Sequence, residues 1–250
     1  MGIAKYKLNK KGSHVAVIIS FVIFVTFLFF IYVALEPAVK SKQAREQFLS
    51  SSKDALFSNF SVNITYASIN IDDDFDIDGE DCLRITGLSQ IMPAGLDGSN
   101  IFVKDSSGAA VGFSWDEGDN SIEVEEENSN RFFKAYVSEA ISSDEASLNG
   151  CPAVSSSRYT LGLIKTEEKA FEQKIVNAIQ AYQAGYSPFK NSIGISEDKN
   201  IGFDFTYSNK TSITTGEESP ETNVYAMEFS FDYLDRNMTS ETGKLTVRTW

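Results

Sequence analysis

An uncharged, mostly apolar run extends from Val15 to Leu35, near the start of the 250-residue chain. This run of 21 residues contains no charged residue and no proline. As a helix it can cross the hydrocarbon core of a bilayer, which takes about 20 residues, whereas strands seldom exceed about ten. The pattern therefore predicts a transmembrane helix over residues 13–36.

The spacing of apolar residues changes directly after this run. Over residues 37–60, Leu49, Leu56 and Phe60 lie on one side of a helix, which predicts an amphipathic helix that continues the membrane helix. Pro37 suits the first turn of this second helix, where its missing N–H costs little.

From residue 61 onward most apolar residues alternate with polar ones, which is typical of strands with one buried face. An Asp-Ser-Ser-Gly sequence at residues 105–108 separates two of these segments and predicts a hairpin turn. Aromatic residues at every second position of the later strands indicate one face of a sheet core. The predicted strands cover residues 61–66, 83–85, 101–104, 110–115, 121–125, 131–137, 201–207, 223–233 and 244–250.

One further helix is predicted over residues 166–184. Thr166 can cap its first turn, and Gly185 is placed to end it. Its apolar stripe consists of Phe171, Ile175, Ala178, Ile179 and Tyr182. The predicted fold class is α+β: a membrane helix, an amphipathic helix, and a domain of mostly antiparallel sheet with one packed helix over residues 61–250. Two lobes, near residues 61–160 and 161–250, are one arrangement of this domain, and residues 244–250 are expected to close its sheet.

Charge predicts the orientation of the membrane helix. Four lysines and no acidic residue precede the span, whereas all 35 Asp and Glu lie beyond Leu35. Because basic flanks stay on the cytoplasmic side, the N-terminus is expected in the cytoplasm and the C-terminal domain outside, in a single-pass protein of the cell membrane. Residues 36–250 carry a net charge of −17, which excludes nucleic acid as a partner of this surface.

The chain has two cysteines, Cys82 and Cys151, and both lie in the predicted exported part. An oxidising exterior favours a disulfide between them, and two unpaired buried thiols are the alternative. Four Asn-x-Ser/Thr sequences are candidate glycosylation sites in an exported chain, at Asn59, Asn63, Asn209 and Asn237.

Little in the exported part suggests catalysis. The one histidine, His14, lies at the start of the membrane span, so neither histidine-dependent catalysis nor zinc binding through imidazole is available in the domain. No spacing singles out another catalytic group, and we expect a protein that is not an enzyme and has no resident cofactor.

Calcium is the one ligand that a local motif suggests. Asp74, Asp76 and Asp78 alternate ahead of Gly79, as in the first half of a calcium-binding loop. The second half of the motif fails because Ile85 stands where a bidentate glutamate belongs. A calcium-binding turn between strands and a solvated acidic turn therefore both remain open.

The leader and the span together resemble the N-terminus of type IV pilin-like precursors, particularly those of archaea, over residues 1 to about 58. The resemblance rests on Lys10-Lys11-Gly12-Ser13 directly before the apolar run. It implies that residues 1–12 form a cytoplasmic leader, that a membrane peptidase cuts between Gly12 and Ser13, and that the apolar helix packs against other pilin-like subunits. Many pilins carry a glutamate at the fifth mature position, and this chain has Val17 there.

The resemblance and its departure together imply a minor or accessory subunit of a type IV pilus-like filament. The alternative is an unprocessed single-pass membrane protein whose extracytoplasmic domain binds a surface partner or calcium.

Overall fold

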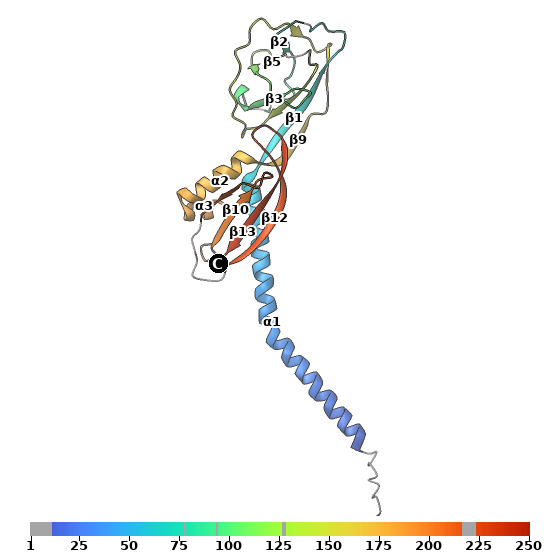
Figure 1. Cartoon of the computed structure of the whole chain (residues 1–250), viewed down its shortest axis with the longest axis vertical. Helices are drawn as coiled ribbons and strands as arrows, with labels where there is room; N and C mark the ends of the chain where they lie inside the picture. Colours follow the sequence, from blue (N-terminus) through green and yellow to red (C-terminus); the bar gives the residue numbers. More distant parts are fainter. Residues whose placement is uncertain (1–11, 78, 94, 127–128, 217–223) are drawn as a thin grey trace, which may run out of the picture. The chain divides into compact units, whose positions relative to one another are not determined.

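The computed structural model describes residues 12–77, 79–93, 95–126, 129–216 and 224–250. The chain divides into two compact units, Met1–Ser50 and Ser51–Trp250. The described part of the first unit is wholly helical, and the second unit contains the described strands, a 3-10 turn and two more α-helices, α2 and α3, which Figure 1 labels together with several of the strands.

Helix α1 runs without interruption from Gly12 to Phe60. It confirms a membrane-length helix that continues into a second helical segment. Pro37 lies inside this helix and not, as predicted, in the first turn of another one. Its ring nitrogen cannot donate to the carbonyl of Val33, a loss that a long helix tolerates when the bonds on both sides are intact.

The last turns of α1 belong to the core of the second unit. Ser52, Leu56 and Phe60 recur every four residues and are almost fully buried. The ring of Phe60 lies 5.9 Å from that of Phe203, centroid to centroid. This confirms the amphipathic pattern for the part of the helix that lies in this unit.

The remaining elements follow in a mixed order of strands and helices. The helices are η1 (Gly98–Asn100, a 3-10 turn), α2 (Glu172–Ala184) and α3 (Tyr186–Ser192). The strands are β1 (Ser61–Ile71), β2 (Cys82–Ile85), β3 (Ile101–Lys104), β4 (Phe113–Asp116), β5 (Ser121–Glu125), β6 (Phe132–Val137), β7 (Ala153–Val154), β8 (Tyr159–Leu161), β9 (Lys165–Phe171), β10 (Ile201–Thr206), β11 (Ser212–Thr214), β12 (Tyr225–Leu234) and β13 (Ser240–Thr249).

Within the described residues these strands form two sheets. The larger has nine strands in the order β11-β10-β13-β12-β9-β1-β6-β3, with β8 also paired to β1. The smaller has four, in the order β4-β5-β2-β7. All pairs are antiparallel except β9 with β12 and β2 with β7, so the mostly antiparallel α+β prediction is confirmed.

The small sheet packs on one face of β1, β6 and β3, and their facing side chains form an apolar core. Ile69 and Phe133 contribute to it from the large sheet, and Leu83 and Ile122 contribute from the small one, each at most 1% exposed. Burial of alternate residues on both sheets gives the structure of a β-sandwich in this part of the unit.

A second core lies over the face of β10, β13 and β12 that the helices cover. Phe203, Phe205, Leu245 and Val247 are fully buried there, at alternating positions of neighbouring strands. The ring centroids of Tyr182 in α2 and Phe203 are 5.9 Å apart. The alternating aromatic residues therefore form a core, as the sequence predicted.

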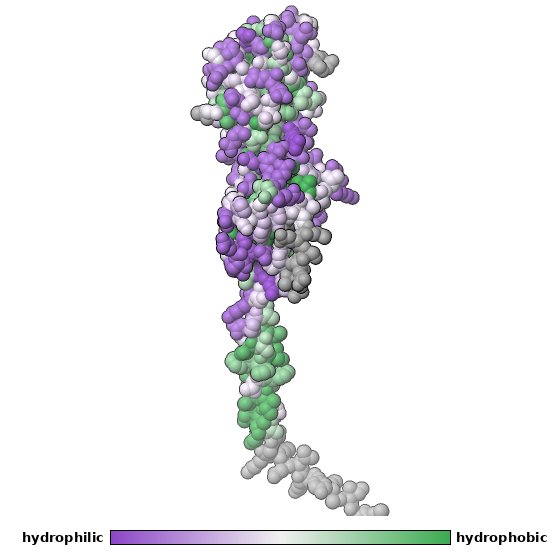
Figure 2. Space-filling model, turned by 90° about the vertical axis from the view of Figure 1, so that its left-hand side faces the viewer, coloured by the Kyte–Doolittle hydropathy of each residue, from purple (hydrophilic) through white to green (hydrophobic). Residues whose placement is uncertain are grey.

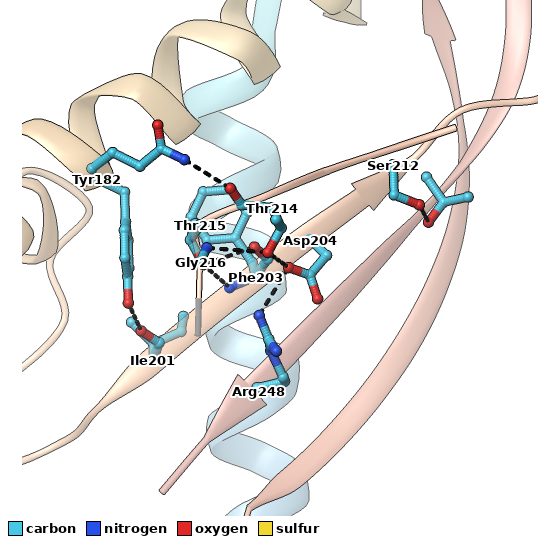
Figure 3. A network of polar contacts seen from close by, with 11 residues as sticks. Tyr182, Ile201, Phe203, Asp204, Ser212, Thr214, Thr215, Gly216 and Arg248 are labelled. Carbon is cyan, nitrogen blue, oxygen red and sulfur yellow. Dashed lines mark hydrogen bonds and ion pairs between the residues drawn. The ribbon is translucent and has the colours of Figure 1, made fainter. Parts of the chain in front are cut away.

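Polar contacts hold the edge strand β11 to its neighbours (Figure 3). Asp204 accepts hydrogen bonds from Thr214 and from the Nη2 atom of Arg248, the latter at 2.8 Å. Gln183 in α2 donates to the carbonyl oxygen of Thr214 at 2.9 Å. Because these groups contact one another, the network has a structural role at the sheet edge.

The predicted helix over residues 166–184 begins too early, because residues up to Phe171 form strand β9. Thr166 pairs with Thr65 of β1, and the two hydroxyl oxygens lie 2.8 Å apart. Pairing with a strand about a hundred residues away thus overrides the local capping signal. The predicted stripe is correct inside α2, where Ile175, Ala178, Ile179 and Tyr182 are buried.

Two other expectations are wrong. The sequence also predicts a turn through residues 186–188; these residues instead begin a short helix, α3, and Pro188 fits because it lies within the first turn. Strand β13 pairs with β10 on one side and with β12 on the other, so it lies inside the sheet and does not close it. Its alternate residues Leu245 and Val247 are fully buried. Within the described residues, β11 and β3 stand at the two ends of the large sheet's strand order.

The hairpin turn at residues 105–108 forms as predicted. The carboxylate of Asp105 accepts backbone hydrogen bonds from Ser107 and Ala109, at 2.8 and 2.9 Å, and Gly108 has a positive φ of 85°. The strands on either side nevertheless end in different sheets, β3 in the large one and β4 in the small one. The chain thus crosses from one layer of the sandwich to the other.

Candidate functional site

The first part of α1 is exposed and apolar on all sides. Every residue from His14 to Leu35 is exposed, and the large hydrophobic side chains range from 36% exposed at Ile31 to 73% at Phe30. Figure 2 shows this segment as a predominantly green, hydrophobic surface. The helix is long and apolar enough to cross a membrane.

A hydroxyl within this segment has its hydrogen-bonding requirement met inside the helix. The Oγ1 atom of Thr26 donates to the carbonyl oxygens of Val22 and Ile23, the latter at 3.1 Å. Such bonding to the preceding turn shields a polar group where water is absent. The segment is therefore suited to a hydrocarbon environment despite its threonine.

The predicted processing site lies at the start of this helix. Gly12 is the first residue of α1 and Ser13 the second, and residues 1–11 lie outside the described part of the chain. Cleavage between Gly12 and Ser13 stays a prediction.

The predicted disulfide is present. Cys82 and Cys151 are bonded, with their Cα atoms 5.1 Å apart, and they close a loop between positions separated by 69 residues. Cys82 opens β2, and Cys151 precedes β7, which pairs with β2 over only two residues. The disulfide thus reinforces the weakest pairing of the small sheet.

The acidic turn that suggested calcium is held by two arginines. Arg158 donates to Asp74 at 2.7 Å, and Arg131 donates to the carbonyl oxygens of Asp72 and Phe75 at 2.6 and 2.9 Å. Asp76 is exposed, and Asp78 lies outside the described residues. Among the residues that the structure describes, no group of three His, Cys, Asp or Glu side chains is arranged to hold a metal.

The four candidate glycosylation sites all have exposed asparagine side chains. Asn59 lies in the last turn of α1, Asn63 lies in β1, and Asn209 and Asn237 lie in turns between strands. Each is accessible to a glycosylating enzyme, and the modification itself stays a prediction.

The structure brings together a pocket of about 390 Å³ that the sequence analysis missed. It lies on the face of β1, β6, β3 and β9 that points away from the small sheet. Lys104, Lys134 and Lys169 line it together with one carboxylate, Glu167. The sequence analysis did not find these residues because they come from three strands far apart along the chain.

Two tyrosines hold one lysine of this pocket in place. The Nζ atom of Lys134 lies 4.8 Å from the ring centroid of Tyr66 and 5.0 Å from that of Tyr136. The pairing of β1 with β6 sets Tyr66 directly opposite Tyr136. A cation over two aromatic rings is stabilised by the negative potential of both faces.

The carboxylate of the pocket lies between two lysines of its own strand. Glu167 is ion-paired with Lys165 and, at 3.3 Å, with Lys169. The hydrogen bond from Lys165 holds the pKa of Glu167 below its ordinary value of 4.5, and the same contact raises the pKa of Lys165. Both shifts favour the charged forms of Glu167 and Lys165.

No protein-family model, curated protein or solved structure matches the chain. Its residues and geometry are thus the basis for any assignment of function. One sequence pattern indicates the pocket: Lys165, Glu167 and Lys169 alternate with other residues, as on one face of a strand. The pattern was missed because this segment was assigned to a helix.

Proposed function

We propose that the chain is a pilin-like surface protein, anchored in the cell membrane by α1 and serving as a minor or accessory subunit of a type IV pilus-like filament. The observation that carries this proposal is that a single helix supplies both an exposed apolar segment of membrane length and a core element of the domain, through Leu56 and Phe60. A helix of this kind couples a membrane anchor to a folded domain without a linker.

Charge supports an orientation with the domain outside the cell. Lys5, Lys7, Lys10 and Lys11 precede the span, and the net charge of residues 36–250 is −17. Positive residues near a span remain on the cytoplasmic side. The disulfide agrees with an oxidising compartment for the domain.

Two features favour an accessory role over that of a main filament subunit. Val17 occupies the position where many pilins carry the glutamate that pairs with a neighbouring subunit. Within the span, Ser20, Thr26 and Ala34, besides Ala16 near its start, are the few small residues that would let helices approach closely. An apolar helix of this composition can contact other pilin-like subunits without the packing of a main filament core.

The N-terminus of the native protein tests the proposal. We expect its intact mass and N-terminal sequence to start at Ser13, with residues 1–12 removed. A Gly12→Ile variant should keep the leader, because a bulky side chain at the cut position blocks the peptidase, whereas Ser13→Ala should be processed normally. A native protein that begins at Met1 or Gly2 would overturn the proposal and leave the unprocessed single-pass protein as the assignment.

A further inference from the structure

The lysine-lined pocket contains more positive charge than its own carboxylate balances. Glu167 is already ion-paired with Lys165 and Lys169. Neither Lys104 nor Lys134 has an ion pair with a carboxylate among the described residues; their contacts are a hydroxyl and two aromatic rings. Two ammonium groups therefore lack a counter-charge.

Lys104 makes this imbalance unusual, because it is only 8% exposed. Its Nζ atom donates to Thr239 Oγ1 at 3.0 Å. Burying an ammonium group without an opposite charge is unfavourable, since a hydroxyl compensates only part of the lost hydration. A bound anion would supply the missing charge at this position.

Lys134 lies beside Lys104 on the same sheet face. The two residues are directly opposite each other in the pairing of β3 with β6. Because the rings of Tyr66 and Tyr136 fix its ammonium group, Lys134 loses little conformational freedom when an anion binds. The pocket is thus organised for a negative group before any ligand arrives.

The rest of the lining matches a ligand with both apolar and hydroxyl-bearing surfaces. Ile64, Leu234 and Met238 form an apolar wall, and Thr239 and Ser240 contribute hydroxyl groups. The volume of about 390 Å³ lies at the small end of the range for ligand pockets, about 300–1,000 Å³. Sugar rings combine these properties, since their C–H faces are apolar and their edges carry hydroxyls.

The charge of the whole domain restricts the ligand to a small one. Residues 36–250 carry −17, so an extended polyanion or an anionic membrane surface would be repelled around the pocket. A single carboxylate on a sugar can lie between Lys104 and Lys134, and the rest of the sugar adds no negative charge for the domain to repel.

We propose that this pocket binds a small saccharide with one carboxylate, such as a single hexuronate unit of an acidic glycan. The carboxylate lies between Lys104 and Lys134, the sugar ring packs on the apolar wall, and Thr239 and Ser240 bond to its hydroxyls. The assignment does not depend on cleavage of the leader or on filament assembly.

Binding can be measured with the full-length protein in detergent micelles, by calorimetry or by saturation-transfer NMR. The probes are glucuronate, glucose and inorganic phosphate. We expect glucuronate to bind at least about tenfold more tightly than either of the others, and its affinity to fall as salt is raised. Equal binding of glucose, absence of glucuronate binding, or phosphate binding as tight as glucuronate would each overturn the saccharide assignment.

Three variants locate the site. Lys134→Met and Lys104→Met should each weaken glucuronate binding about tenfold or more, whereas Lys244→Met, which removes an exposed lysine paired with Glu228, should not. Lys104→Met should keep or raise the melting temperature, because it removes a buried charge that lacks a counter-charge. If Lys104→Met fails to fold, Lys134→Met decides the outcome, and unchanged glucuronate affinity in that variant overturns the proposal.

Discussion

Strands β1 and β6 present two faces that differ in chemistry, although the same stretch of backbone forms both. Toward the small sheet they carry Ala67, Ile69, Phe133 and Ala135, each at most 1% exposed. Toward the other side they carry Tyr66, Lys134 and Tyr136, which line the lysine-lined pocket. The inward face is wholly apolar, whereas the outward face places lysine and tyrosine side chains beside buried apolar residues such as Ile64.

The largest effect is expected on the inward face. Phe133→Ala should lower the free energy of unfolding by about 4 kcal/mol, because it leaves a cavity in a fully buried core. Urea unfolding of the full-length protein in detergent micelles measures this loss. A loss below about 1 kcal/mol would contradict the view that this face carries the stability of the sandwich.

The disulfide supports the sheet that covers this inward face. Replacing both Cys82 and Cys151 by serine should cost about 3 kcal/mol, because the unfolded chain regains the freedom that a 69-residue separation had restricted. The same unfolding experiment applies. A reducing agent should destabilise the wild type similarly and have no effect on the double variant.

On the outward face the corresponding substitution should be mild. Lys134→Met should change the free energy of unfolding by less than about 1 kcal/mol, since the methionine keeps the packing of the lysine stem and loses the contacts with the two rings. A loss comparable to that of Phe133→Ala would show that the two faces do not differ in the way described.

The smallest effect is a pH dependence confined to the outward face. Because the pKa of Glu167 is lowered in the folded protein, its contribution to stability is complete above pH 4.5 and is lost as the pH falls through the folded value. The urea midpoint of the wild type should therefore fall more steeply below pH 4.5 than that of Glu167→Gln. Lys165→Met, which removes the principal cause of the shift, should flatten the profile similarly; an unchanged slope in both variants would refute the coupling.

Periodicity predicted most of the elements of this fold, and the failures within the sheet have one cause. The alternation over residues 101–104 and 121–125 predicted β3 and β5 with their bounds unchanged. Residues 166–171 were assigned to a helix because the signal for an N-cap is local, whereas the strand partner of Thr166 is Thr65. Likewise, β13 lies inside the sheet because it pairs with both β10 and β12, and no pattern within β13 indicates these partners.

The candidate sites also differ in whether a short stretch of sequence is enough to identify them. Glycosylation sequences, the leader and the cysteine pair are short signals, and each could be named from the sequence. The pocket could not, because Lys104, Lys134 and Lys169 are ordinary strand residues taken singly. Their separation along the chain hides the fact that strand pairing places them on one face.

The sequence by itself determined the exposed apolar helix, the alternation of the strands and the opportunity for one disulfide, since each depends on the order of neighbouring residues or on the number of cysteines. Only the tertiary structure decided which strands pair, that Thr166 belongs to a strand, and that lysines from three strands surround one pocket. The physical reason is that a strand satisfies its backbone hydrogen bonds with partners distant in the chain, whereas a helix satisfies them within itself.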